Sequence, residues 1–169
     1  MNPMELCDLV DGRLEAWHGL GRLDAGAVPA CVGTAQHAEW LGFSRGRLHY
    51  RRYQTASGAA VWLFDRDGFI VLVEHFPAGD PPVEPWLEVL GAPDRTIEYG
   101  VAQLMQRPLA RTDEDVDELV WGARGLALLR GRTDRGERLI RTRGFAPGDA
   151  DDYRRRFVEL PRIEYGSMP

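Results

Sequence analysis

The motif Phe-x-x-Gly-Asp occurs twice in this chain, and its two copies constrain the fold more than any single residue propensity does. The first copy spans residues 76–80 and the second spans residues 145–149, so the spacing is 69 residues. Each copy follows an apolar stretch that opens at a glycine turn, Asp67-Gly68 in the first and Arg135-Gly136 in the second. Gly adopts a positive φ at low cost, so both dipeptides are typical of hairpin turns. We therefore interpret the chain as a tandem duplication of one supersecondary unit.

Each unit is predicted to contain a helix followed by a three-stranded antiparallel meander, which is an α+β fold with helices on one face of a sheet that can run on through both units. The first unit covers residues 1–79 with an N-terminal extension, and its elements are a helix over residues 25–32 and strands over residues 48–54, 59–65 and 69–75. The second unit covers residues 80–169 with an acidic insertion, and its elements are a helix over residues 82–90, strands over residues 118–123, 126–131 and 138–143, and a C-terminal helix over residues 151–157.

Three aspartates precede helical patterns, where a carboxylate can accept hydrogen bonds from the first free amides. These are Asp24, Asp80 and Asp149. Asp24 and Gly12 each fall 56 residues before Asp80 and Gly68. The N-terminal segment is therefore a candidate for a third, partial repeat.

Several features of the second unit resemble the BamE/SmpA-type unit, which β-lactamase inhibitory proteins carry in tandem. They are Leu90-Gly91-Ala92-Pro93 after a short helix, Val120-Trp121 on one strand, residues 126–129 on the next and a last strand that turns at Gly136. The resemblance extends over residues 80–145 and, more weakly, over residues 24–76, where Val32-Gly33-Thr34-Ala35 lacks the proline. It implies helices on one face of an antiparallel sheet and another face that binds proteins. Membrane anchoring is not implied, since Cys7 follows Pro3-Met4-Glu5-Leu6 without a hydrophobic signal.

Composition and charge narrow the classes of function. Two cysteines, Cys7 and Cys31, are too few for a disulfide framework, and we find no secretory signal, so a reducing cytoplasm is the expected compartment. No apolar run approaches the roughly 20 residues that cross a bilayer. The net charge of −5 disfavours nucleic-acid binding. The sequence therefore indicates a protein that binds neither membranes nor nucleic acids.

A search for catalytic and metal-binding patterns favours a protein that is not an enzyme. The four histidines, His18, His37, His49 and His75, lie in separate segments with no i, i+4 pair, and neither cysteine is near them in the sequence. No serine lies in a nucleophile elbow, and no glycine-rich loop is followed by the lysine of a phosphate site. We therefore predict no catalytic residues, no metal and no cofactor.

Aromatic side chains on the predicted strands are the strongest functional signal. Phe69 to Val73 is apolar at every position, which suits a strand with both faces covered. We predict a non-catalytic module that binds another protein, most concretely an immunity or inhibitor protein acting on a toxin or enzyme with a basic surface. Its predicted contact residues are Tyr50, Arg52, Trp62, Phe64, Trp121, Arg141, Arg143, Asp113, Glu114 and Asp115.

Two alternatives stay open at this point. The first is a small-molecule binder or small enzyme that uses a cleft between the units, lined by Glu74, His75, His49 and Arg52. The second is a homodimer in which the apolar second face joins two copies of the chain. An enclosed pocket where the four polar groups converge would favour the first, and the oligomeric state would decide the second.

Overall fold

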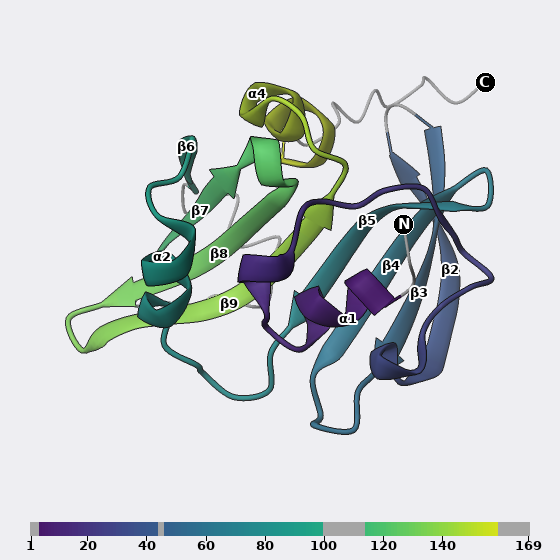
Figure 1. Cartoon of the computed structure of the whole chain (residues 1–169), viewed down its shortest axis with the longest axis horizontal. Helices are drawn as coiled ribbons and strands as arrows, with labels where there is room; N and C mark the ends of the chain where they lie inside the picture. Colours follow the sequence, from purple (N-terminus) through teal and green to yellow (C-terminus); the bar gives the residue numbers. More distant parts are fainter. Residues whose placement is uncertain (1–3, 44–45, 100–113, 159–169) are drawn as a thin grey trace, which may run out of the picture.

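One antiparallel sheet forms the centre of the protein, whose computed structural model describes residues 4–43, 46–99 and 114–158 (Figure 1). Its main strands follow the order β2-β3-β4-β5-β9-β8-β7-β6, and a short strand β1 pairs with β5 off this path, which makes nine strands in the described part of the chain. Their bounds are Leu23–Asp24 (β1), Thr34–Phe43 (β2), Gly46–Gln54 (β3), Ala60–Arg66 (β4), Phe69–Phe76 (β5), Arg95–Glu98 (β6), Asp115–Trp121 (β7), Leu126–Thr133 (β8) and Gly136–Phe145 (β9). The prediction of an α+β protein with an antiparallel sheet is confirmed at this level, and the sheet dominates the described residues.

The helices are short and lie around the sheet. They are α1 (Met4–Val10), α2 (Glu84–Leu90) and α4 (Ala150–Tyr153), which continues into one turn of π-helix, η4 (Arg154–Val158). Three 3₁₀ turns occur at Leu14–Ala16 (η1), Ala30–Val32 (η2) and Gly122–Arg124 (η3). Among the described residues, no helix is long and apolar enough to cross a membrane.

The two predicted meanders are present, and their last strands pair with each other. The hairpin between β4 and β5 turns at Asp67-Gly68, where both residues have positive φ, 53° and 79°. Strands β5 and β9 then join the meanders through four antiparallel pairs, Leu72 with Phe145, Val73 with Gly144, Glu74 with Arg143 and His75 with Thr142. The sheet is therefore continuous from β2 to β6.

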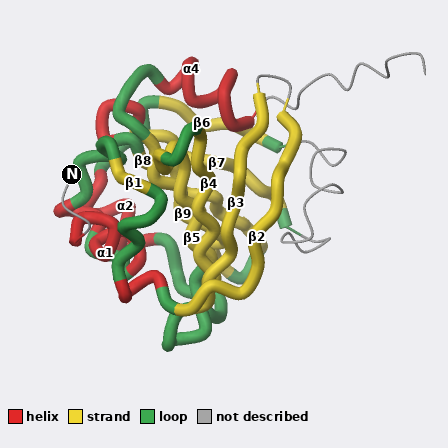
Figure 2. The backbone as a smooth tube through the Cα atoms, turned by 90° about the vertical axis from the view of Figure 1, so that its right-hand side faces the viewer, coloured by secondary structure: helices red, strands yellow, loops and turns green. Residues whose placement is uncertain are grey.

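The face that carries α1 and α2, in front of the sheet in Figure 1, is called the front face here. Its buried strand residues include Val61 and Leu63 on β4, Val73 on β5 and Leu126 and Leu128 on β8. Figure 2 shows α1, α2 and β1 together on this side of the sheet. The N-terminal segment is held on the sheet mainly by the apolar surface that it buries in this cluster. Such burial contributes about 25 cal/mol of stability per Å².

The opposite face, called the back face here, carries a second buried cluster. It includes Phe64 on β4, Leu72 on β5, Leu129 on β8 and Ile140 and Phe145 on β9. Tyr153 and Val158 of the C-terminal helical turns belong to the same cluster. Both sheet faces are thus covered in part, which explains why β4 and β5 are apolar on both sides.

The predicted helix over residues 25–32 is wrong. This segment instead follows β1 and contains only the 3₁₀ turn Ala30–Val32. The backbone of Ala25 is engaged elsewhere, since its N–H donates to Gly68 O at 2.9 Å and its carbonyl accepts from Arg51 at 2.5 Å. Pro29, which has no N–H, directly precedes the turn. Tertiary hydrogen bonds therefore replace the helical ones in this segment.

Three of the described strands are not predicted, and two of the predicted helices are confirmed. The strands that the prediction lacks are β1, which has only two residues, and β2 and β6, neither of which has a clear alternation of apolar and polar residues. The helix over residues 82–90 corresponds to α2, with Gly91 at a φ of 70° after its end, and the helix over residues 151–157 corresponds to α4 and η4. Asp149 caps α4 by accepting from Asp151 N at 2.8 Å, whereas Asp80 pairs with Arg138 and does not cap α2.

Replacing Gly144 with Ala is expected to destabilise the protein by about 1–3 kcal/mol, because a Cβ there would overpack the front face. That atom would lie 2.7 Å from Trp17 and 2.8 Å from Leu9. Gly148→Ala is the matched control, since the nearest atom to its Cβ would be 3.9 Å away. Urea unfolding of both variants measures the difference, and equal midpoints would contradict this packing.

Candidate functional site

Four charged side chains form a buried cluster on the back face, where β5 and β9 join the two meanders. Arg143 donates from Nε to Glu74 Oε1 at 2.6 Å, and Arg141 donates from Nη1 to the same oxygen at 3.1 Å. Arg141 also reaches Glu118 Oε1 at 2.9 Å through Nη2. All four side chains are at most 7% exposed. We call Glu74, Glu118, Arg141 and Arg143 the charge cluster.

Strand geometry explains how these residues meet. Arg141 and Arg143 are two positions apart on β9 and therefore share a face, and Glu74 is the direct cross-strand neighbour of Arg143. Glu118 comes from β7, two strands away, where it lies opposite Leu129 of β8, which in turn lies opposite Arg141. Two carboxylates therefore face two guanidinium groups, so the cluster carries no net charge.

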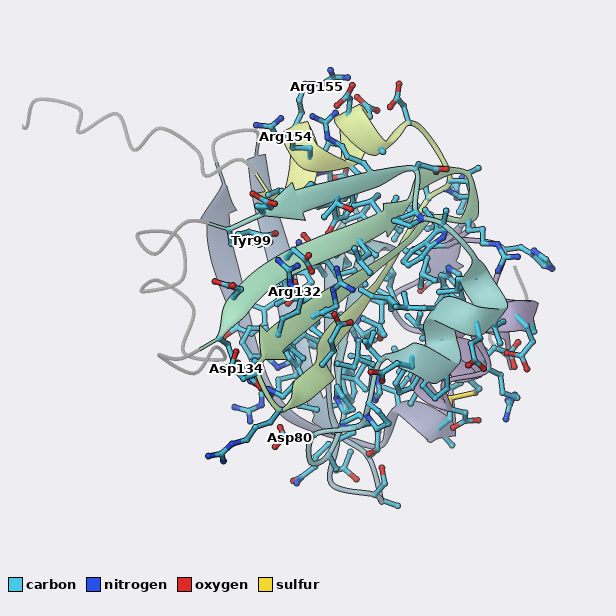
Figure 3. All side chains as sticks on the ribbon, turned by 90° about the vertical axis from the view of Figure 1, so that its left-hand side faces the viewer. Asp80, Tyr99, Arg132, Asp134, Arg154 and Arg155 are labelled. Carbon is cyan, nitrogen blue, oxygen red and sulfur yellow. A yellow bond between two sulfur atoms is a disulfide. The ribbon has the colours of Figure 1, made fainter. Side chains whose placement is uncertain are left out.

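Two tyrosines complete the cluster. The Tyr99 hydroxyl donates to Glu118, and the Tyr153 hydroxyl accepts from Arg143 Nη1 at 2.9 Å. Figure 3 shows Tyr99 beside this part of the sheet and shows Arg154 and Arg155 on the C-terminal helical turns above it. Tyr153 ties those turns to the charge cluster.

The electrostatics favour ionised carboxylates in this interior. Burial alone would raise the pKa of Glu118, but Arg143 and Arg141, with hydrogen bonds from Tyr99 and Tyr153, outweigh it and lower the pKa to about 2. Burial also raises the pKa of the Tyr153 phenol well above its usual value. Arg141 Nε has no hydrogen-bond partner among the described residues. Almost all of the charged groups of the cluster are therefore paired with one another.

An aromatic group lies next to the charge cluster on the first meander. Tyr50 of β3 stacks on Trp62 of β4 with 5.6 Å between ring centroids, and the Trp62 ring lies 5.5 Å from that of Phe76. Phe64 contacts both Tyr50 and Trp62. The Arg52 guanidinium lies 6.0 Å from the Trp62 ring. We call Tyr50, Arg52, Trp62, Phe64 and Phe76 the aromatic group.

The structure therefore brings together four of the predicted contact residues, Tyr50, Arg52, Trp62 and Phe64. Register accounts for this, because Tyr50 pairs with Phe64 and Arg52 pairs with Trp62 across β3 and β4. Arg52 is exposed, Tyr50 and Trp62 are half-buried, and Phe64 is buried. Arg52 and the half-buried rings form the accessible part.

Other predicted contact residues lie inside the molecule. Trp121 belongs to the front-face core and is 4% exposed, while Arg141 and Arg143 belong to the charge cluster. Their burial corrects the expectation that they lie on one open sheet face with Trp62. Trp121 reaches the front face because it alternates with Val120, which lies on the back face.

The run of acidic residues at positions 113–118 is buried at most of its described positions as well. Glu114 is buried and accepts two hydrogen bonds from Arg138, at 2.5 Å and 2.8 Å. Asp117 is 1% exposed and pairs with Arg130 at 2.8 Å and 2.9 Å. Asp115 is exposed at the start of β7, and Asp113 lies outside the described residues. Of the two predicted acidic contact residues that the structure describes, Glu114 is therefore buried and Asp115 is accessible.

The four residues proposed to line a cleft do not converge. Glu74 and Arg52 lie on the back face, whereas His75 lies on the front-face side, 3.4 Å from Thr142 Oγ1 through Nδ1. His49 pairs with Asp65 at 3.0 Å, and Arg51 lies 3.7 Å from the same carboxylate. Burial lowers the pKa of His75 to about 4, with Asp11 acting weakly in the opposite direction. His75 is therefore a neutral core residue at pH 7.

No group of three or more His, Cys, Asp or Glu side chains within residues 4–43, 46–99 and 114–158 could hold a metal ion. Comparisons of the chain with protein families, with curated proteins and with solved structures found no match. The site is therefore interpreted from its own geometry.

Sequence reasoning missed the charge cluster and the disulfide between Cys7 and Cys31. A usable signal for the cluster was present, because Glu74 and Arg143 are 69 residues apart and each lies two residues before a copy of the motif. The disulfide joins residues 24 apart, one in the N-terminal extension and one in the segment predicted as a helix over residues 25–32. Because the two cysteines are paired, the cysteine count no longer supports the prediction of a reducing compartment.

Removal of one carboxylate charge from the charge cluster is expected to lower the stability of the fold strongly. Glu118→Gln should destabilise the fold by about 3–5 kcal/mol, because it leaves Arg141 and Arg143 buried with one carboxylate fewer. Asp152→Asn is the control, since Asp152 pairs with Arg155 at the surface and its loss should cost under about 1 kcal/mol. Urea unfolding measures both, and equal losses would contradict the internal role of Glu118.

Stability is expected to fall in two steps as the pH falls. The pKa of His75 is about 4 in the folded protein and 6.5 in the unfolded chain. As the pH falls from 6.5 to 4, the unfolded chain therefore binds a proton that the folded protein does not bind, which lowers the free energy of unfolding by roughly 3 kcal/mol. The lowered pKa of Glu118 adds a further loss as the pH falls from 4.5 towards 2.

His75→Gln tests the first of these steps. Chemical unfolding between pH 7.5 and 4 should show a flatter profile for this variant than for the wild-type protein. Parallel profiles would show that His75 does not titrate between its unfolded and folded values.

Proposed function

We propose that this chain is a non-catalytic protein-binding module and that the accessible part of the aromatic group is its contact surface. The observation that carries the proposal is the arrangement of Trp62, half-buried between Tyr50 and Phe76 with the exposed Arg52 beside its ring. Trp, Tyr and Arg are enriched among the residues that dominate the energetics of protein interfaces. Trp and Tyr supply large contact area with few rotatable bonds. Rings held by each other before binding lose little further freedom when a partner docks.

The rigid support of this surface favours binding over catalysis. Titratable groups beside it on the same face of the sheet are paired internally, Glu74 with Arg143 and Glu118 with Arg141. An enzyme of this size needs polar groups that can accept or donate protons to a substrate, and these groups are engaged with one another. The neighbouring cluster acts in this proposal as a scaffold.

Within this class we propose an immunity or inhibitor protein that neutralises another protein, such as a toxin or an enzyme. The net charge of −5 supports a partner with a basic surface. The acidic run contributes less to this argument than its sequence indicates, since Glu114 and Asp117 are neutralised by Arg138 and Arg130. A cytoplasmic location remains part of the proposal.

We also propose that the two meanders descend from one duplicated unit of BamE/SmpA type. The strand order supports this, because it is symmetrical about the pairing of β5 with β9. In the pairing of β5 with β9, Glu74 and Arg143, the two residues separated by the motif spacing of 69, lie directly opposite each other. The halves differ in their covering elements, since α2 packs on the second half and the N-terminal segment takes the place of a helix on the first.

The protein-binding proposal predicts that Arg52→Glu and Trp62→Ala each weaken binding of the partner by at least about tenfold. Val89→Ser is the matched control, because Val89 is 48% exposed on α2, away from the aromatic group, and should bind as the wild-type protein does. Cross-linking in the native cell identifies the partner, and calorimetry with the purified pair measures affinity. Wild-type affinity in both aromatic-group variants would refute this surface.

A further inference from the structure

The N-terminal segment, residues 4–33, crosses the front face and is bonded to both meanders. On the second meander, Trp17 Nε1 donates to Gly125 O at 3.2 Å and Leu20 N donates to Phe145 O at 2.8 Å. On the first meander, β1 pairs with β5, and Ala25 bonds to both Gly68 and Arg51. Residues 17–25 are therefore fixed to the sheet through hydrogen bonds.

Helix α1 is attached in a different way. None of the hydrogen bonds described for Met4–Val10 reaches the sheet. Leu6 and Leu9 are fully buried, and Leu9 packs against the bare backbone of Gly144, next to the pairing of β5 with β9. A helix of seven residues has little stability of its own in water, so α1 depends on these tertiary contacts.

The disulfide is the covalent part of this attachment. Cys7 lies in α1, and Cys31 lies in the turn Ala30–Val32, which leads directly into β2. Figure 3 shows the bond on the side of the molecule that carries the N-terminal helix. Cys31 is half-buried and Cys7 is 6% exposed, so Cys31 is the more accessible residue of the pair.

We propose that the Cys7–Cys31 disulfide is a redox-sensitive clasp that holds α1 over the junction of β5 and β9. A dithiol reductant attacks Cys31 Sγ, and the S–S bond breaks. The reductant donates two electrons and two protons, so Cys7 and Cys31 become thiols and the reductant becomes a disulfide. Helix α1 then detaches and uncovers the apolar front face around Gly144, while residues 17–25 and the sheet keep their bonds. This inference does not depend on the aromatic group or on the identity of its partner.

The place of the bond suits a redox-sensing role. It fastens a helix of seven residues, and the hydrogen bonds described for that helix do not reach the sheet.

Hydrogen exchange of the full chain, with and without dithiothreitol, tests the clasp. Exchange of amides in residues 6–10 is expected to rise at least tenfold after reduction, and that of β4, β5, β8 and β9 to stay within twofold. Alkylation of both thiols, detected by mass, proves that reduction is complete. Reoxidation should restore the slow exchange.

The double variant Cys7→Ser, Cys31→Ser is the matched control. It should exchange fast in residues 6–10 whether or not dithiothreitol is present. Unchanged exchange of α1 in fully alkylated protein would overturn the proposal, because α1 would then be held by packing alone. A rise of similar size throughout the sheet would also overturn it, because the disulfide would then stabilise the whole fold.

Discussion

The pairing of β5 with β9 is the interaction on which the rest of the structure depends. Only four residue pairs join the two meanders there, yet the front-face core, the back-face core and the C-terminal helical turns all pack across that line. A slip of one residue would turn every side chain of β9 to the other face. It would place Arg143 in the front-face core and Gly144 on the back face, so Leu9 and Trp17 would lose the bare backbone on which they pack. The register is therefore specified from both sides of the sheet.

The charge cluster contributes to that specification more than to net stability. Buried ion pairs recover little more than the free energy lost when their charges leave water, and well-packed apolar residues often stabilise a core as well. What the cluster adds is selectivity, because Arg141 and Arg143 both need Glu74, and Glu74 lies opposite Arg143 in one register only. Any other pairing of β5 with β9 would leave buried charges without partners. We interpret the cluster as the device that selects this register.

Much of the sheet could be predicted from the sequence, because its central strands have strong local signals. Alternating or continuous apolar residues identified β3, β4, β5, β7, β8 and β9, and positive φ at Asp67 and Gly68 agrees with the predicted hairpin. The segment over residues 25–32 failed because its fate is decided by distant groups, the Gly68 carbonyl and the Arg51 guanidinium. The same limitation hid the partners of the acidic run. A cluster of carboxylates is typical of a solvated loop until the arginines of β8 and β9 are seen to lie beside it.

The candidate surface illustrates the same division between local and distant information. Tyr50, Arg52, Trp62 and Phe64 lie on adjacent strands of one hairpin, so their grouping follows from strand alternation and register, which local sequence can supply. Arg141, Arg143 and Trp121 lie on the other meander, and their burial depends on β5, α4 and the N-terminal segment. The aromatic side chains on the predicted strands suggested an exposed face, but most of them are buried in the two cores on the two faces of the sheet. What stays accessible is the small group around Trp62, whose cross-strand neighbour is Glu74 of the charge cluster. A partner that docks on Trp62 would therefore contact a surface that is bordered, on the same face of the sheet, by the residues that select the register of the whole sheet.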